Sequence, residues 1–240
     1  MMVVLRSALF ALFQAVITPI FAALALLSFP LPAATRYRII TTWSRWIVAG
    51  ADRICGIRYR VLGVDRVPPI PFIVLSKHQS AWETLAFQVI FPRQVWVVKR
   101  ELLWVPFFGW GLAMLSPIAI DRGSGARALG QLLEQGRERL AQGLCIVIFP
   151  EGTRVAPGAR GHYRAGGAWL AAKTATPVLP VAHNAGELWP RNAWIKRPGV
   201  VTVSIGAPID PARLTPDELI HRVEEWIEGE VLRISRESRP

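Results

Sequence analysis

A long uncharged segment near the amino terminus constrains the fold of this chain most. Arg6 and Arg36 have no charged residue between them, and the intervening residues are mainly Leu, Ala, Phe, Val and Ile. A helix of about 20 apolar residues crosses the core of a bilayer, so this segment is long enough to span one. We therefore expect a helical membrane anchor at the start of the chain.

Two other interpretations of this segment stay open. A cleaved signal peptide would also combine a basic residue with an apolar core, although Leu31-Pro32-Ala33-Ala34 is a poor small-x-small cleavage site. Pro19, in the middle of the segment, allows two shorter helices that lie in one leaflet. We favour an anchor that is retained, whether it spans the membrane or lies in one leaflet.

The next stretch of the chain is basic and aromatic. Residues 35–60 contain one acidic residue, Asp52, and the arginines Arg36, Arg38, Arg45, Arg53, Arg58 and Arg60. Aromatic and basic residues beside an apolar segment are typical of a membrane interface with anionic head groups, although an amphipathic helix with a solvated basic face would look similar. We therefore expect residues 1–60 to form a membrane-association segment, with this basic side in the cytoplasm.

From residue 61 to residue 240 the pattern is that of an α/β domain. Short apolar runs at residues 72–75, 95–98, 115–120, 144–149, 177–181 and 200–205 favour strands. Helical patterns cover residues 81–89 and 126–142, and a capped helix begins near Thr215. Alternating strands and helices predict a mostly parallel sheet covered by helices.

A polar turn after the run at 72–75 carries the first candidate site residues, His78 and Glu83. Five residues apart on one helix they would face about 140° away from each other, so they can meet only if His78 precedes the helix. Ser80 as N-cap would allow this, and a histidine oriented by a carboxylate can act as a general base. Ser80-Ala81-Trp82-Glu83 is also a capping box, in which Glu83 would only bind the Ser80 backbone N–H.

Two arginines follow other predicted strands. Arg122 comes after the run at 115–120 and Arg154 after the run at 144–149. The carboxyl ends of parallel strands meet at one edge of a sheet, and a guanidinium group matches phosphate oxygens in a bidentate fork. We expect these arginines to form a phosphate-binding wall beside His78. Cys55 and Cys145 stand in apolar contexts without metal-ligand spacing, so we expect buried thiols, no metal site and a reducing compartment.

Four blocks of residues resemble those of the glycerolipid acyltransferases of the lysophosphatidic acid acyltransferase (PlsC-like) family. The blocks are Lys77-His78-Gln79-Ser80-Ala81-Trp82-Glu83-Thr84; Lys99-Arg100-Glu101-Leu102 with Ile120-Asp121-Arg122; Phe149-Pro150-Glu151-Gly152-Thr153-Arg154 with Tyr163-Arg164-Ala165-Gly166; and Val178-Leu179-Pro180-Val181. They occur in family order over residues 72–182, and the third matches almost letter for letter. Glu83 stands where many members have aspartate.

The resemblance implies transfer of an acyl group from acyl-CoA or acyl carrier protein to the sn-2 hydroxyl of 1-acyl-glycerol-3-phosphate, giving phosphatidic acid. His78 would be the base and Glu83 its orienting carboxylate, while Arg122 and Arg154 would bind the acceptor phosphate. Glu151, Gly152 and Thr153 would shape the acceptor pocket, with Lys99 as a neighbouring cation. No cofactor is implied beyond the acyl donor as co-substrate, and the expected partners are membrane lipids, lysophosphatidic acid and the donor carrier.

Three alternatives remain beside this interpretation. The formal net charge of +11 would suit a nucleic-acid-binding module, but the strongest arginine cluster adjoins a segment of lipid length, so we expect no nucleic acid partner. A noncatalytic lipid-binding membrane protein would leave the four ordered blocks unexplained. Another lysophospholipid, or lyso-ornithine lipid, could be the acceptor on the same scaffold. We expect the enzyme at the inner membrane, with its active site on the cytoplasmic side.

Overall fold

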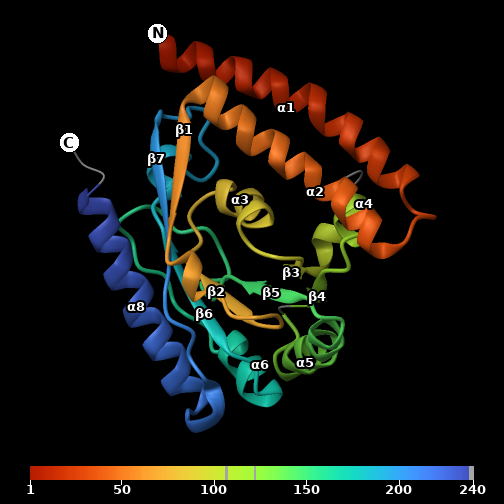
Figure 1. Ribbon diagram of the computed structural model, residues 1–240, viewed down its shortest axis with the longest axis vertical. Helices are drawn as coiled ribbons and strands as arrows, with labels where there is room; N and C mark the ends of the chain where they lie inside the picture. Colours follow the sequence, from red (N-terminus) through yellow and green to blue (C-terminus); the bar gives the residue numbers. More distant parts are fainter. Residues whose placement is uncertain (106–107, 122, 238–240) are drawn as a thin grey trace.

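The computed structural model describes residues 1–105, 108–121 and 123–237, and it has the expected α/β architecture (Figure 1). The strands are β1 (Ile57–Leu62), β2 (Ile73–Ser76), β3 (Gln94–Lys99), β4 (Ile118–Ile120), β5 (Cys145–Ile148), β6 (Val178–His183) and β7 (Gly199–Ile205). The helices are α1 (Met2–Leu27), α2 (Ala33–Gly50), α3 (Trp82–Ile90), α4 (Phe108–Ala113), α5 (Ala126–Ala141), α6 (Gly166–Thr174), α7 (Ala185–Leu188) and α8 (Pro216–Glu237). Short 3-10 or π-helical turns occupy Ala51–Cys55, Val64–Arg66, Arg100–Trp104 and Pro211–Arg213.

The strands lie in the order β1-β7-β6-β2-β5-β3-β4. All neighbouring pairs are parallel except β6 and β7. The prediction of a mostly parallel sheet covered by helices is therefore confirmed. Because β6, β2, β5, β3 and β4 run the same way, their carboxyl ends form one edge, and the segments that carry the candidate site residues leave the sheet there.

Both faces of the sheet are covered, as the continuous apolar run at residues 72–75 predicts. Phe72 and Val74 pack with residues of α1, α2 and α3, whereas Ile73 and Leu75 pack with residues of α5, α6 and α8. This alternation follows from the two-residue period of a strand. Figure 1 shows α1, α2 and α3 on one side of the sheet and α5, α6 and α8 on the other.

One strand was not among those expected. Residues 57–62 form β1, which pairs in parallel with β7 at the edge of the sheet, and its first residue, Ile57, is fully buried. Arg58 and Arg60 point outward from this edge strand, so their charge had suggested an interface rather than a sheet. The boundary drawn at residue 60 falls inside this strand.

The apolar amino-terminal segment folds as α1, which is long and apolar enough to cross a membrane. The helix runs through Pro19 without a break, and the chain turns back at residues 28–32 into α2. Phe10 is fully buried in the main core and stacks edge-on against Trp189, with ring centroids 5.3 Å apart. Because α1 supplies part of the core, it is an integral element of this fold, which argues against removal as a signal peptide.

Candidate active site

His78 and Glu83 form a hydrogen-bonded pair at the carboxyl edge of the sheet. The distance between His78 Nδ1 and Glu83 Oε1 is 2.9 Å, and the Glu83 side chain is fully buried. A carboxylate can only accept, so Nδ1 carries a proton, and in the neutral imidazole Nε2 is then the nitrogen with the lone pair. The His78 ring also stacks on Phe149, with centroids 4.0 Å apart and planes 14° apart. The pair is therefore arranged as a base with its orienting carboxylate.

The capping box and the His–Glu pair exist together. Glu83 Oε1 also accepts hydrogen bonds from the backbone N–H groups of Gln79, at 2.8 Å, and Ser80, at 2.7 Å. The Trp82 N–H donates to Ser80 Oγ at 3.0 Å, but the N-cap position of α3 is taken by Ala81, one residue after the expected Ser80. The same oxygen thus fixes the turn and the imidazole.

Charge and burial act against each other on this carboxylate. Burial alone would raise the pKa of Glu83, but interactions with His183 and His78 and the hydrogen bond from the Ser80 N–H lower it below its usual value. Burial lowers the pKa of His183, although the charge of Glu83 opposes this shift. Its Nε2 lies 2.8 Å from the Lys77 carbonyl oxygen, and its Nδ1 accepts from the Ala185 N–H at 3.3 Å. His183, the last residue of β6, is thus held on both ring nitrogens by backbone groups.

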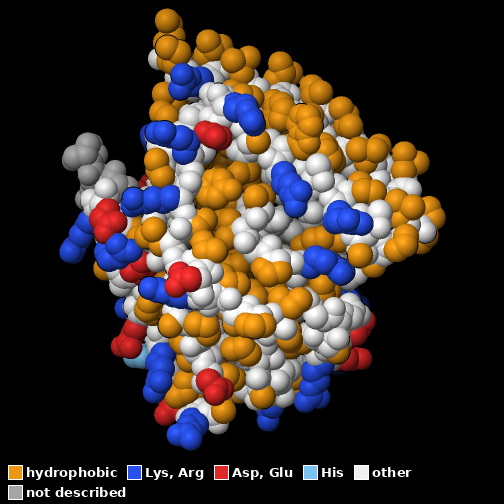
Figure 2. All heavy atoms as spheres, viewed as in Figure 1, with side chains coloured by type: hydrophobic (Ala, Val, Ile, Leu, Met, Phe, Trp, Pro, Cys, Tyr) orange, Lys and Arg blue, Asp and Glu red, His pale blue; other side chains and the backbone are white. Residues whose placement is uncertain are grey.

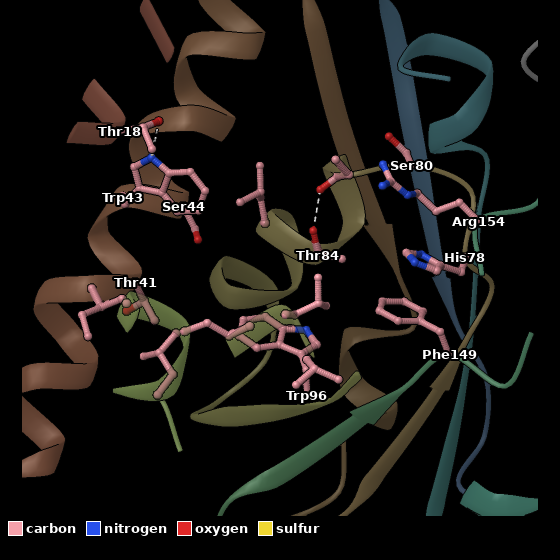
Figure 3. Close-up of a pocket in the computed structure, with 18 of the residues that line it drawn as sticks. Thr18, Thr41, Trp43, Ser44, His78, Ser80, Thr84, Trp96, Phe149 and Arg154 are labelled. Atoms are coloured by element: carbon pink, nitrogen blue, oxygen red, sulfur yellow. Dashed lines mark hydrogen bonds between the residues drawn. The ribbon is translucent and has the colours of Figure 1, made fainter. Parts of the chain in front are cut away.

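A cavity of about 640 Å³ opens beside His78. Its polar end contains His78, Gly152, Thr153 and Arg154, and Lys99 lies at its wall. Figure 3 shows His78 and Arg154 extending into this space from the same side, with Phe149 below the imidazole. The cavity therefore brings together an imidazole and a guanidinium group, those of the predicted site residues His78 and Arg154.

The rest of the cavity is apolar and runs between helices. Its walls come from α1, α2, α4 and β3 and include Thr18, Phe21, Ala22, Ala25, Ile40, Trp43, Trp96 and Leu112. Figure 3 shows Thr18, Thr41, Trp43 and Ser44 facing the space opposite His78, and Trp96 at its base. The dimensions and lining suit a flexible hydrocarbon chain whose polar end reaches His78.

The predicted site residues differ in what they contact. Arg122 lies outside the residues that the structure describes. Glu151 is 5% exposed and does not appear among the described residues that line the cavity; its oxygens bind Lys77 Nζ and the His78 N–H. Burial raises the pKa of Glu151, opposed by those two partners. Gly152 has φ +68°, which favours glycine, and its N–H donates to the Phe149 carbonyl oxygen at 2.9 Å.

Arg191 is a cavity residue that the sequence interpretation did not include. It follows α7, lines the cavity beside Arg154, and donates from its Nη1 to the Arg154 carbonyl oxygen at 3.0 Å. It lies outside the four blocks, and an isolated arginine in a loop has no local pattern that marks it as a site residue. The folded chain therefore adds a third described cation, with Lys99 and Arg154, to the walls of this cavity.

The comparisons with known proteins agree with this architecture. A family model described as Acyltransferase matches residues 58–184. The chain is 45% identical over 209 residues to the 1-acyl-sn-glycerol-3-phosphate acyltransferase of Pseudomonas aeruginosa, covering 85% of this chain and 81% of that protein. It is 30% identical over 220 residues to the mouse 1-acyl-sn-glycerol-3-phosphate acyltransferase alpha, covering 89% and 76%.

A solved structure, that of the 1-acyl-sn-glycerophosphate acyltransferase PlsC from Thermotoga maritima, has the same fold, with a TM-score of 0.79. The match covers 96% of this chain and 95% of the Thermotoga maritima chain, at 24% sequence identity. At that identity it is evidence for the fold alone. The fold and the site define an enzyme of the acyltransferase class. Together with the family match and the curated relatives, they show that the chain belongs to the 1-acyl-sn-glycerol-3-phosphate acyltransferase family.

Proposed function

We propose that this enzyme transfers a fatty acyl group from acyl-CoA or acyl carrier protein to the sn-2 hydroxyl of 1-acyl-glycerol-3-phosphate, forming phosphatidic acid. The observation that carries the proposal is the single cavity in which His78 and Arg154 face one apolar channel. A lysophospholipid with a phosphate head group has the matching parts: an anion for the guanidinium, a hydroxyl for the base and a hydrocarbon chain. The names of the relatives point to the same acceptor.

The reaction needs a base because a neutral hydroxyl is a weak nucleophile, whereas the thioester is already activated. His78 Nε2 takes the proton of the sn-2 hydroxyl while its oxygen attacks the thioester carbonyl carbon. The tetrahedral intermediate then collapses, the carbon–sulfur bond breaks, and the imidazolium returns the proton to the leaving thiolate. Glu83, held 2.9 Å from Nδ1, stabilises the imidazolium formed in between.

Other cavity residues have supporting roles in this scheme. Arg154 and Arg122 bind the acceptor phosphate, and Gly152 and Thr153 shape the pocket around it. The oxyanion of the intermediate needs a donor, and the Gly152 N–H is already used in its own turn. Lys99, whose side chain lines the same cavity, is the candidate donor, and the scheme uses no metal or other cofactor.

The amino-terminal helices support a position at the membrane. Most of the outer face of α1 is exposed and apolar, whereas its inner face packs on α2 and the core. In this proposal the outer face lies in the cytoplasmic leaflet of the inner membrane, and the cavity between α1, α2 and the sheet receives lipid from that leaflet.

The test is an acyl-transfer assay in detergent with His78→Ala and a panel of acceptors. Wild-type enzyme should release thiol from acyl-CoA or acyl carrier protein fastest with lysophosphatidic acid, and His78→Ala should lower the turnover number by roughly a hundredfold to ten-thousandfold. His221→Ala removes an exposed histidine of α8 and is the matched control, with unchanged turnover expected. Turnover of His78→Ala near that of wild type would remove the base role, and faster reaction with another lysophospholipid or lyso-ornithine lipid would change the acceptor.

A further inference from the structure

A buried ion cluster lies directly behind the candidate base, on the side of the sheet away from the cavity. Lys77 is fully buried, and its Nζ contacts Glu151 Oε1 at 2.8 Å, Glu228 Oε1 at 2.7 Å and the Ala159 carbonyl oxygen at 3.2 Å. An ammonium group has three N–H donors, so these contacts use all of them. The described residues that line the cavity do not include Lys77, Glu151 or Glu228.

The cluster connects α8 to the main chain at His78. Glu228, on α8, also accepts a hydrogen bond from the Tyr163 hydroxyl at 2.8 Å, which fixes the oxygen that binds Lys77. Lys77 in turn holds one oxygen of Glu151, and the other oxygen of Glu151 accepts from the His78 N–H at 2.9 Å. Contacts of hydrogen-bond length therefore run without a gap from α8 to the catalytic turn.

The peptide unit between Lys77 and His78 is held at both ends. Its N–H donates to Glu151, and its carbonyl oxygen accepts from His183 Nε2. The next carbonyl oxygen, that of His78, accepts from the Val155 N–H at 2.8 Å. These bonds fix the backbone dihedral angles around His78, and with them the direction in which its side chain leaves the main chain.

Stability alone is a poor explanation for this cluster. Burying charged groups has a large desolvation cost, and apolar side chains of similar volume often stabilise a fold equally well or better. A cluster that instead orients a nearby functional group has a reason to remain ionic, because its directional bonds determine a position.

We propose that Lys77 and Glu228 are positioning residues for acyl transfer: anchored by α8, Lys77 sets Glu151 so that Glu151 holds the His78 backbone in the orientation needed for catalysis. Glu151 then acts through His78 rather than by contact with the acceptor. The inference rests on the proposed role of His78 as the base.

The test compares Lys77→Met and Glu228→Leu, which leaves no acceptor for Lys77, with wild type in steady-state acyl transfer, using whichever acceptor the wild type prefers. Each variant should lower kcat at least tenfold, whereas KM for the donor and for the acceptor should stay within about twofold, because neither side chain contacts a substrate. The double variant should fall no further than Lys77→Met, since both substitutions break the same connection. Glu228 is partly exposed, so Glu228→Leu remains informative if Lys77→Met fails to fold.

Two control variants on α8 separate positioning from stability. Glu225→Leu makes the same substitution at an exposed carboxylate of the same helix and should leave kcat unchanged. Val223→Ala truncates a fully buried side chain of α8, so it should lower the melting temperature while keeping kcat at temperatures where the protein is folded.

Different results would overturn the inference and the proposed function. Folded Glu228→Leu or Lys77→Met protein with kcat within twofold of wild type would remove the positioning role, as would a rise in KM at constant kcat. An equal loss of kcat in Val223→Ala at a matched melting temperature would show that the cluster is only structural. His78→Ala still decides separately whether His78 is the base.

Discussion

At the scale of single residues, Glu83 makes two kinds of contact that the sequence presented as alternatives, one with the His78 ring and one with the backbone at the start of α3. One carboxylate oxygen accepts three hydrogen bonds, from His78 Nδ1 and from the N–H groups of Gln79 and Ser80. A capping box leaves the second oxygen of its carboxylate unassigned, and here Oε2 is buried and has no hydrogen-bond partner among the described residues. The hydrogen bonds that the Glu83 side chain makes with described residues are therefore all made at the oxygen that contacts His78.

This arrangement allows a substitution that removes the charge and keeps the geometry. In Glu83→Gln the amide oxygen can take the place of Oε1 and accept the same three bonds, with the amide nitrogen at the position of Oε2. We expect kcat to fall about 100-fold or more because the imidazolium loses its counter-charge, whereas KM for both substrates changes little. Steady-state kinetics at constant pH measures this split, and a kcat equal to that of wild type would show that Glu83 acts only as a cap.

The sequence was informative about the site where the relevant residues are close together along the chain. His78 and Glu83 share one turn, and Gly152, Thr153 and Arg154 share another, so local spacing suffices to group them. Lys77 and Glu228 are 151 residues apart, and only the folded chain brings them to 2.7 Å. Arg191 and Phe149 were missed as site residues for the same reason: their roles depend on contacts that no local pattern records.

At the scale of elements, the pattern of apolar residues predicted every described strand except β1, and the helices α1, α3, α5 and α8. The order of the strands, and helices such as α6 and α7, came from the fold. The capping box at Thr215 and Glu218 is present, with Glu218 Oε2 accepting from the Thr215 N–H at 2.8 Å, and α8 begins at Pro216 as expected. The antiparallel direction of β7 has no signal in its own residues. The apolar cavity also has no signal in any one stretch of the sequence, because α1, α2, α4 and β3 build it together.

The contribution of α1 to that cavity leads to a prediction about chain length. Ala22 lines the cavity, whereas its neighbour Ala23 is exposed. Phenylalanine at position 22 should occupy the space of several methylene groups and lower kcat/KM for palmitoyl donors by roughly tenfold, while octanoyl donors react almost normally. Ala23→Phe makes the same change outside the cavity and should leave both rates unaltered. Equal losses for the two donors in Ala22→Phe would mean that this part of the cavity does not hold the donor chain.

At the scale of the whole molecule, the apolar surface, the basic residues and the mouth of the cavity belong to one region. Figure 2 shows hydrophobic side chains concentrated along the outer side of α1 and basic side chains over the neighbouring face. The exposed apolar residues of α1 include Leu5, Leu9, Leu12, Val16, Ile20, Leu24 and Leu27. Since α1 is packed against the domain along its inner side, its length does not require it to leave the domain and cross the bilayer. An outer face immersed in one leaflet would place the cavity where its lipid substrates are.

This geometry predicts that membrane binding depends on the outer face of α1 and not on exposed apolar residues elsewhere. Leu12 is 63% exposed on α1, and Leu232 is 56% exposed on α8, so Leu12→Glu and Leu232→Glu introduce the same charge at comparable exposure. A charged side chain in the apolar part of a membrane costs about 2.5–3.5 kcal/mol on insertion scales, and less near the interface. We therefore expect Leu12→Glu to weaken binding to anionic vesicles at least tenfold in co-sedimentation, with Leu232→Glu bound like wild type.

Leu12 does not occur among the described residues that line the cavity, so turnover of lysophosphatidic acid presented in detergent should be retained in both variants. Equal binding by the two variants would place the membrane contact away from α1 and would remove the route by which lipid enters the cavity from the leaflet.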